Sequence, residues 1–211
     1  VDVTSTTVTG AVSSINTAYN SSGISGLGNE AITVNSVTAS VLEVNALDAL
    51  TSGVVTATIS NTDLGTLDTL TGTGNAYTIS VTDASVSADA LTTLDSKTSV
   101  AVDVTSTTVT GAVSDINTAY DSSGISGLGN EAITVDSGTA SVFEANTLDA
   151  LTSGVVTATI TNNDIASLDT LTGTGNAYTI SVTDASVSAA SLNALDSKTS
   201  VAVDVTSTTV T

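Results

Sequence analysis

The chain has 211 residues, and because only 2% of them are aromatic while 40% are hydrophobic, any core must be thin and built from Val, Ile, Leu and Ala. Its 21 acidic residues against two lysines give a net charge of −19, which disfavours nucleic acid and anionic lipid as partners. The sequence holds no Cys and no His, and therefore no disulfide and none of the usual nucleophile–base pairs. We expect no catalytic residues, no enzyme activity and no obligatory cofactor.

The nonapeptide VDVTSTTVT occurs at residues 1–9, 102–110 and 203–211, always 101 residues apart. Residues 1–101 and 102–202 differ at only 16 positions. The chain is therefore predicted to consist of two repeat blocks, 1–101 and 102–202, and the start of a third, 203–211. A fixed period of this kind indicates stacked repeats that form one continuous solenoid. Neither end reads as a polar cap, so we expect either that the native chain continues on both sides or that copies stack end to end. The expected partner is therefore the protein itself, by end-to-end continuation of the solenoid and by lateral packing.

Four short helices are predicted in each block, because pairs of apolar residues recur at a spacing of three. In the first block three segments are 10–21, 41–50 and 86–94, and the fourth follows Asp63 and contains Leu67 and Leu70. Their apolar pairs are Val12/Ile15, Leu47/Leu50, Leu67/Leu70 and Leu91/Leu94. Each segment follows a residue that commonly caps a helix: Thr9, Ser40, Asp63 or Ser87.

Strands are predicted between these helices, at 31–34, 54–59, 76–81 and 100–104, where β-branched residues alternate with polar ones. We place Val55, Ala57 and Ile59 on the buried face, and likewise Tyr77, Ile79 and Val81, and Val100, Val102 and Val104. The Gly- and Ser-rich stretch 20–29, repeated at 121–130, is predicted to be an inserted loop, so that each block has four coils.

The unit that emerges is a coil of about 22 residues, with a strand, a turn and a short helix. Strands joined through helices pair in parallel, and the crossover is right-handed in nearly all cases. The predicted fold class is α/β, a right-handed solenoid with a continuous parallel sheet. The alternative is an all-β parallel β-helix, in which the helical segments are further strands.

Acidic residues in the predicted turns are weak candidates for calcium ligands. Asp63 and Asp83, with their copies Asp164 and Asp184, lie where stacked coils could bring carboxylates together, and calcium requires several oxygen ligands. The alternative is that these residues cap helices or face solvent in turns. The sequence lacks the glycine-rich nonapeptide of calcium-binding β-rolls.

Outward threonines also raise the question of an ice-binding face. Thr56 and Thr58, with their copies Thr157 and Thr159, form a Thr-X-Thr pair once per block. An ice-binding face needs threonine at equivalent positions of nearly every coil, whereas the predicted stacking aligns Thr58 with Ser80, Asp103 and Thr33. We therefore interpret these threonines as ordinary strand formers.

Several phrases resemble those of very long tandem-repeat surface proteins of marine bacteria, in particular cyanobacteria. They are TVTGAVSSINTAY (7–19), GISGLGNEAITV (23–34), LDALTSGVVTAT (47–58) and SVSADALTTLDSKTSVAVD (85–103). The resemblance covers essentially the whole chain and implies an extracellular or cell-surface location and a structural or adhesive role. It brings no catalytic residues.

Two functions are therefore expected. The first is a structural segment of a long extracellular filament, stalk or surface-layer-like protein that extends by stacking coils. The alternative is an adhesin or calcium-dependent ligand-binding repeat, with residues 22–29 as contact points. No run of about 18 apolar residues is present, so we expect no insertion into a membrane.

Overall fold

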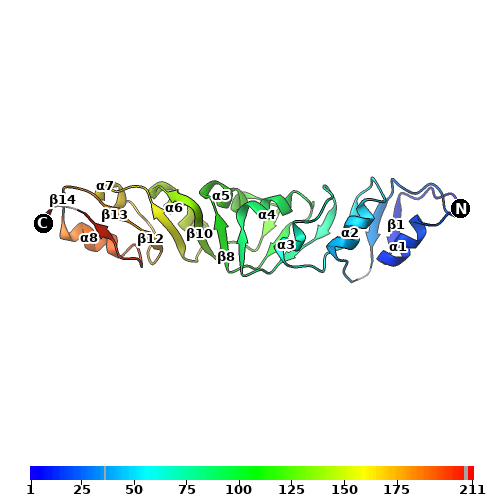
Figure 1. The fold of residues 1–211 in the computed structure, drawn as a ribbon, viewed down its shortest axis with the longest axis horizontal. Coiled ribbons are helices and arrows are strands. Elements are labelled where there is room, and N and C mark those ends of the chain that lie inside the picture. The colour runs from blue at the N-terminus through cyan, green and yellow to red at the C-terminus, as the bar shows by residue number, and fades with distance from the viewer. Residues whose placement is uncertain (36, 207–208) are drawn as a thin grey trace. The chain divides into compact units, whose positions relative to one another are not determined.

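The computed structural model describes residues 1–35, 37–206 and 209–211, in which eight short helices alternate with short strands (Figure 1). All the strand pairings found among these residues are parallel, and the paired strands form several sheets with no closed barrel. The fold class is thus mixed α/β, and the all-β alternative is wrong. The chain divides into two compact units, which are described separately: unit 1 is Val1–Asp83, Ala90–Thr105 and Ser122–Gly127, and unit 2 is Ala84–Asp89, Ser106–Asp121 and Leu128–Thr211.

The helices lie at the predicted segments, with α4 and α8 extending one residue further than predicted. They are α1 (Val12–Tyr19), α2 (Val41–Asp48), α3 (Leu64–Leu67), α4 (Ala88–Asp95), α5 (Val113–Asp121), α6 (Val142–Leu151), α7 (Ile165–Leu168) and α8 (Ala189–Asp196). Ser40 begins α2 with a capping box, in which its hydroxyl and the Glu43 carboxylate each accept a backbone N–H of the other residue. Thr9 is not a cap, because it lies in a strand and α1 follows Ala11 without a side-chain cap.

Unit 1 contains two parallel sheets. The first has the order β1 (Thr7–Gly10), β2 (Ala31–Val34), β3 (Val55–Thr58) and β4 (Ala76–Thr78). The second has the order β5 (Ser80–Val81), β7 (Val102–Val104) and β9 (Ile125–Ser126).

Unit 2 contains a five-stranded sheet and two strand pairs. The sheet has the order β12 (Ala177–Thr179), β11 (Val156–Ile160), β10 (Ala132–Ala140), β8 (Thr108–Gly111) and β6 (Ser85–Ser87). The pairs are β13 (Ser181–Val182) with β15 (Asp204–Val205), and β14 (Ser186–Val187) with β16 (Thr209–Val210).

The core consists of the inward strand residues and one face of each longer helix. As predicted, Val55, Ala57 and Ile59 are buried, and so are Tyr77, Ile79 and Val81; Val41, Val44 and Leu47 of α2 are buried with them in unit 1. The prediction for Val100 is wrong: it is 37% exposed, because it lies in the turn that precedes β7, whereas Val102 and Val104 are buried. Apart from Tyr77 and its copy Tyr178, the core is built from aliphatic side chains, as the composition predicts.

The register shows that each strand pairs with a segment roughly one predicted coil further along the chain. Val8 pairs with Ile32 and Ile32 with Val55, and further on Thr56 pairs with Ala76 and Asn75 with Thr98. Hydrogen bonds between successive layers span the same separations, from 20 residues between Val55 and Asn75 to 24 residues between Asn75 and Ser99. We call this separation the layer step. Four layer steps fall short of one repeat block, so each block contains part of a further layer.

The predicted inserted loop takes part in this pairing, so that prediction is wrong in part. Ser25 forms a parallel bridge with Asp2, and in the second block Ile125–Ser126 is strand β9 beside β7. Residues 20–29 and 121–130 supply part of the additional layer, which explains why the helix spacing is longest there.

Candidate functional site

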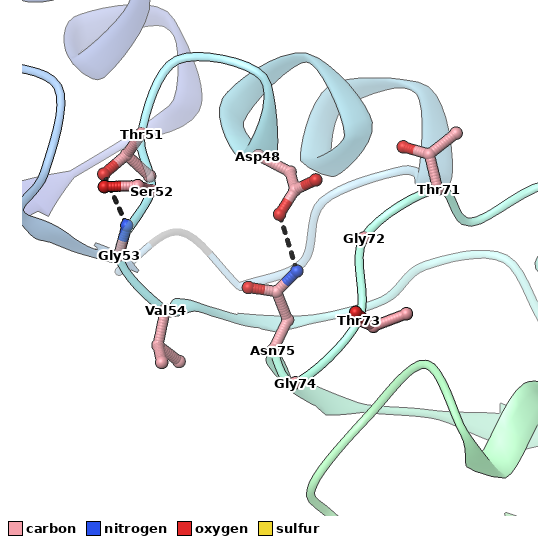
Figure 2. Close-up of a pocket in the computed structure, with 10 residues that line it drawn as sticks. All are labelled: Asp48, Thr51, Ser52, Gly53, Val54, Thr71, Gly72, Thr73, Gly74 and Asn75. Atoms are coloured by element: carbon pink, nitrogen blue, oxygen red, sulfur yellow. Dashed lines mark hydrogen bonds between the residues drawn. The ribbon is translucent and has the colours of Figure 1, made fainter.

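A depression of unit 1 lies where α2 ends and the chain turns toward β3. It has a volume of about 370 Å³ and is shallow and polar. Figure 2 shows its lining: Asp48, Thr51, Ser52, Gly53, Val54, Thr71, Gly72, Thr73, Gly74 and Asn75. Unit 2 has a depression of about 390 Å³ lined by the same ten residue types, from Asp149 to Asn176.

Asn75 is the centre of this depression, and its side chain is almost fully buried, with 2% exposed. Its amide nitrogen donates to the carboxylate of Asp48 at 2.7 Å (Figure 2), and its amide oxygen accepts the backbone N–H of Val55 at 2.7 Å. Asn176 makes the equivalent bonds to Asp149 and Val156, at 2.7 and 2.8 Å. Each amide therefore connects two segments that precede it in the chain. The segment that begins β3 or β11 lies one layer step before the amide, and the end of α2 or α6 lies 27 residues before it.

Gly72 leaves the space that this bond needs. A Cβ atom at Gly72 would collide with the Asn75 amide nitrogen and would lie 2.6 Å from a carboxylate oxygen of Asp48. Gly74 turns the chain beside it with a φ of +75°, a conformation that side chains disfavour. Gly72, Gly74 and Asn75 are thus required by geometry, and the Thr-Gly-Thr-Gly-Asn sequence that contains them recurs unchanged at 172–176.

The hydroxyls on the opposite wall are also used within the protein. Thr51 donates to the backbone carbonyl of Glu30 at 2.5 Å and accepts the N–H of Gly53 at 3.0 Å (Figure 2). Ser52 bonds through its backbone N–H to the carbonyl of Gly28 at 3.0 Å. This wall therefore fastens the turn after α2 to the segment that precedes β2.

A buried carboxylate organises that preceding segment. Glu30 is 2% exposed and accepts the N–H of Gly28 at 2.8 Å and the hydroxyl of Tyr19 at 3.0 Å. The bond from the Gly28 backbone is the main reason that the pKa of Glu30 lies below its usual value. Burial, together with the Glu30 carboxylate, raises the pKa of Tyr19 to about 12. In unit 2, Glu131 takes the same position between Tyr120 and Gly129.

The structure brings Asp63 and Asp83 together at the first turn of α3. Asp63 accepts the N–H of Thr66 at 2.9 Å, and Asp83 accepts the N–H of Leu64 at 2.7 Å. The hydrogen bonds from Thr66 hold the pKa of Asp63 below its usual range. Asp164 and Asp184 repeat this arrangement at α7, where they accept from Ser167 and Ile165, both at 2.8 Å. These carboxylates therefore act as helix caps, as in the alternative interpretation of the sequence.

The depression offers few carboxylate oxygens that could bind a metal ion. Asp48 is the only carboxylate that lines the depression of unit 1, and no group of three or more acidic, His or Cys side chains is found within the described ranges. Calcium takes six to eight oxygen ligands, so a cation here would depend on hydroxyls, carbonyls and water for most of them.

Asn75, Thr51 and Gly72 were not predicted as important residues. Asn75 and Thr51 each bond to a segment at least one layer step away, and Gly72 matters because it leaves space for the bond between Asn75 and Asp48. No local periodicity reveals such contacts. The available signal was the spacing of 27 residues between Asp48 and Asn75, which recurs between Asp95 and Ser122, where the Ser122 hydroxyl donates to the Asp95 carboxylate at 2.8 Å.

No protein-family model, curated protein or solved structure matches the chain. Among the residues with a described position, no helix has the length and apolar character needed to cross a bilayer.

Proposed function

We propose that this chain is a structural segment of a long extracellular or cell-surface filament, stalk or surface layer, built as a right-handed solenoid. Each layer step in the strand register is one coil of that solenoid, with a strand spacing of about 4.8 Å between neighbouring coils. The two blocks and the start of the third form one continuous array. Its role is extension rather than catalysis.

The observation that supports this proposal is that the buried polar groups form hydrogen bonds between successive layers. Asn75 and Thr51 both bond across coils. The hydroxyl of Thr98 donates to the carbonyl of Tyr77 at 2.8 Å and accepts its N–H at 3.0 Å, and Thr199 does the same with Tyr178. Side chains that an enzyme or receptor would turn toward a ligand are here consumed in joining one layer to the next.

A sheet edge supports association between copies. β1 is an edge strand of the four-stranded sheet in unit 1, and an edge strand presents unpaired backbone groups to another strand. The other edge strand, β4, is already covered, because the Thr98 hydroxyl bonds both the N–H and the carbonyl of Tyr77. We therefore propose that copies continue one another end to end. The resemblance of the sequence to long surface proteins supports the proposed location.

Electron microscopy of chains with two, four and six blocks tests the proposal. A solenoid predicts particles whose length rises linearly with block number at constant width, by about 21 Å per block for about four and a half coils. Particles that widen in all directions as blocks are added would contradict it.

The alternative, an adhesin or calcium-dependent ligand-binding repeat, is favoured by one observation, the pairing of Asp63 with Asp83. A calcium titration followed by thermal melting separates the two functions. Binding to the folded chain alone would raise Tm as calcium increases. If Tm at millimolar calcium equals Tm in chelator at the same ionic strength, the calcium-dependent version is wrong.

A further inference from the structure

Threonines on the exposed faces of the sheets are aligned in rows across the strands. In unit 1 the row is Thr9, Thr33, Thr56 and Ala76, and a second row pairs Thr58 with Thr78. In unit 2 the rows are Ser87, Thr110, Thr134, Thr157 and Ala177, and Thr139, Thr159 and Thr179. The stacking predicted from sequence, which aligned Thr58 with Ser80, Asp103 and Thr33, is therefore wrong for Thr58 and Thr33, whereas the alignment of Ser80 with Asp103 is confirmed.

The error came from the strand boundaries. The predicted strand 76–81 is two strands, β4 and β5, and Ser80 belongs to a different sheet, where Asp103 is its partner. With the register corrected, threonine recurs on three successive strands in the longest row of each unit, so the objection to an ice-binding face applies only to the ends of these rows.

On the four-stranded sheet, the threonine hydroxyls of these rows are available to a ligand. On the five-stranded sheet, the hydroxyl of Thr110 already donates to the carbonyl of Val86 at 3.4 Å. The residues between the row threonines, such as Ile32 and Ala57, are buried, so Thr33, Thr56 and Thr58 lie on the opposite, outer face. Their hydroxyls make no hydrogen bond to any protein atom that the structure describes. Threonines of the turns differ, since Thr51 and Thr98 donate to backbone carbonyls.

The face of unit 1 is also uncharged, although the chain carries 21 acidic residues. The outward positions of β1 to β4 hold only threonine and alanine: Thr7, Thr9, Ala31, Thr33, Thr56, Thr58, Ala76 and Thr78. The counterpart in unit 2 does carry a charge, because the exposed Asp136 lies in β10 two residues after Thr134, where unit 1 has Asn35. The uncharged surface of unit 1 in so acidic a chain needs a specific explanation.

The chemistry of the face indicates what it can bind. Protein interfaces are built around aromatic residues and arginine, which are absent here, and no ring is present on which a sugar could stack. The face presents a grid of threonine side chains, each with one methyl and one hydroxyl group. Neighbouring threonines are about 4.8 Å apart from strand to strand and about 6.6 Å apart along a strand. Methyl groups order the water beside them, and hydroxyls take a place in its hydrogen-bond network.

We propose that the threonine face of the four-stranded sheet, together with its counterpart on the five-stranded sheet, binds the surface of ice. The proposed partner is a crystalline lattice of water. A two-dimensional array of regularly spaced hydroxyls fits such a repeating lattice better than it fits a single small molecule. The inference rests on the parallel pairing and the exposed threonines, and is independent of the proposed filament.

Inhibition of ice recrystallisation by the whole chain tests the proposal. The wild type is expected to stop the growth of ice grains, and a variant with Thr33, Thr56, Thr134 and Thr157 all replaced by Lys should need about a tenfold higher concentration or more. The matched control replaces Thr71, Thr73, Thr172 and Thr174 by Lys. It adds the same charge at exposed positions away from the rows, and should act as the wild type does.

A second variant keeps the proposal testable if the lysine variant does not fold. Replacement of the same four row threonines by Ser keeps the hydroxyls, removes the methyl groups and leaves the sheet intact; it should also weaken inhibition. Wild-type protein that leaves grain growth unchanged would overturn the proposal, as would row variants as active as the wild type. Sedimentation that shows copies pairing through this face, without any effect on ice, would overturn it in favour of a second copy as the partner.

Discussion

The side-chain amide of Asn75 is satisfied on both of its ends, one by a carboxylate and the other by a backbone N–H. A buried polar group that loses such partners costs about 1–3 kcal/mol, because it keeps its desolvation penalty without compensation. At the scale of single residues, the stability of this fold therefore depends on a few polar side chains as much as on its apolar ones.

Replacement of Asn75 by Ala is expected to lower the free energy of unfolding by about 1–3 kcal/mol, because the N–H of Val55 and the carboxylate of Asp48 lose their partner. Urea denaturation followed by circular dichroism measures the change. Thr73→Ala, an exposed substitution at the rim of the same depression, is the control and should stay within about 0.5 kcal/mol of the wild type. Equal effects of the two substitutions would show that the amide bonds contribute nothing particular.

Gly72→Ala is expected to destabilise the fold, because the added Cβ collides with the amide of Asn75 and crowds the carboxylate of Asp48. Overpacking of this kind typically costs about 1–3 kcal/mol. Gly65→Ala is a matched control: its Cβ would meet nothing closer than an Asp63 oxygen at 3.9 Å, and the second block has Ala166 at that position. Gly65→Ala should be neutral or stabilising, since alanine favours a helix. A Gly72→Ala variant as stable as Gly65→Ala would contradict the steric argument.

Element boundaries were predictable where a local signal exists. Ser40 and Asp63 have the residue type and spacing of helix caps, and both cap the predicted helices. The strand at 76–81 was not divided correctly, because alternation continues through Ile79 and nothing local marks the change from one sheet to the other. Likewise β6 and β1 were missed, since Ser and Thr carry little of the apolar alternation that indicates a strand.

At the scale of elements, the segment before β2 depends on the charge of Glu30. Because the pKa of this carboxyl is lower in the folded chain than in the unfolded one, its contribution is fully present above the unfolded pKa of about 4.3 and is lost as the pH falls through the folded value. The pKa values of Glu43, Asp63, Glu144 and Asp164 are shifted in the same direction. The protein as a whole should therefore lose stability in acid.

Glu30→Gln is expected to lower Tm at pH 7 and to reduce the further drop in Tm between about pH 5 and pH 2, since one of the responsible carboxylates is gone. Melting curves at a series of pH values measure both effects. Asp68→Asn removes one negative charge from an exposed position at the end of α3 and serves as the control. An acid profile of Glu30→Gln that runs parallel to that of the wild type would contradict the role of this carboxylate.

At the scale of the whole chain, charge opposes folding. With 21 acidic residues and two lysines, self-repulsion favours expanded conformations, and dissolved salt screens it. Tm is expected to rise as NaCl increases from about 10 mM to about 500 mM, because the Debye length shortens from about 30 Å to less than about 10 Å. Choline chloride at matched ionic strength should give the same rise, and a Tm that is constant or falls with salt would contradict this account.

The α/β class of the fold could be predicted from the sequence, but the register in which its strands pair could not. Periodicity of two and of nearly four residues indicated strands and helices, and parallel pairing followed from their alternation. The register required knowledge of which residues one layer step apart are in contact. For the same reason the depression around Asn75 and the rows through Thr33 and Thr56 could be located only in three dimensions.

The lengths of the layers have a consequence for how such a chain can change over time. Since Asn75 pairs with Thr98, loss of residues 76–98 would remove one layer and join two positions that already stack. A deletion of half that length would instead put every later segment out of phase. Insertions and losses of one layer step are thus the natural increments by which this molecule can be lengthened or shortened, and they are much finer than the block in which its sequence repeats.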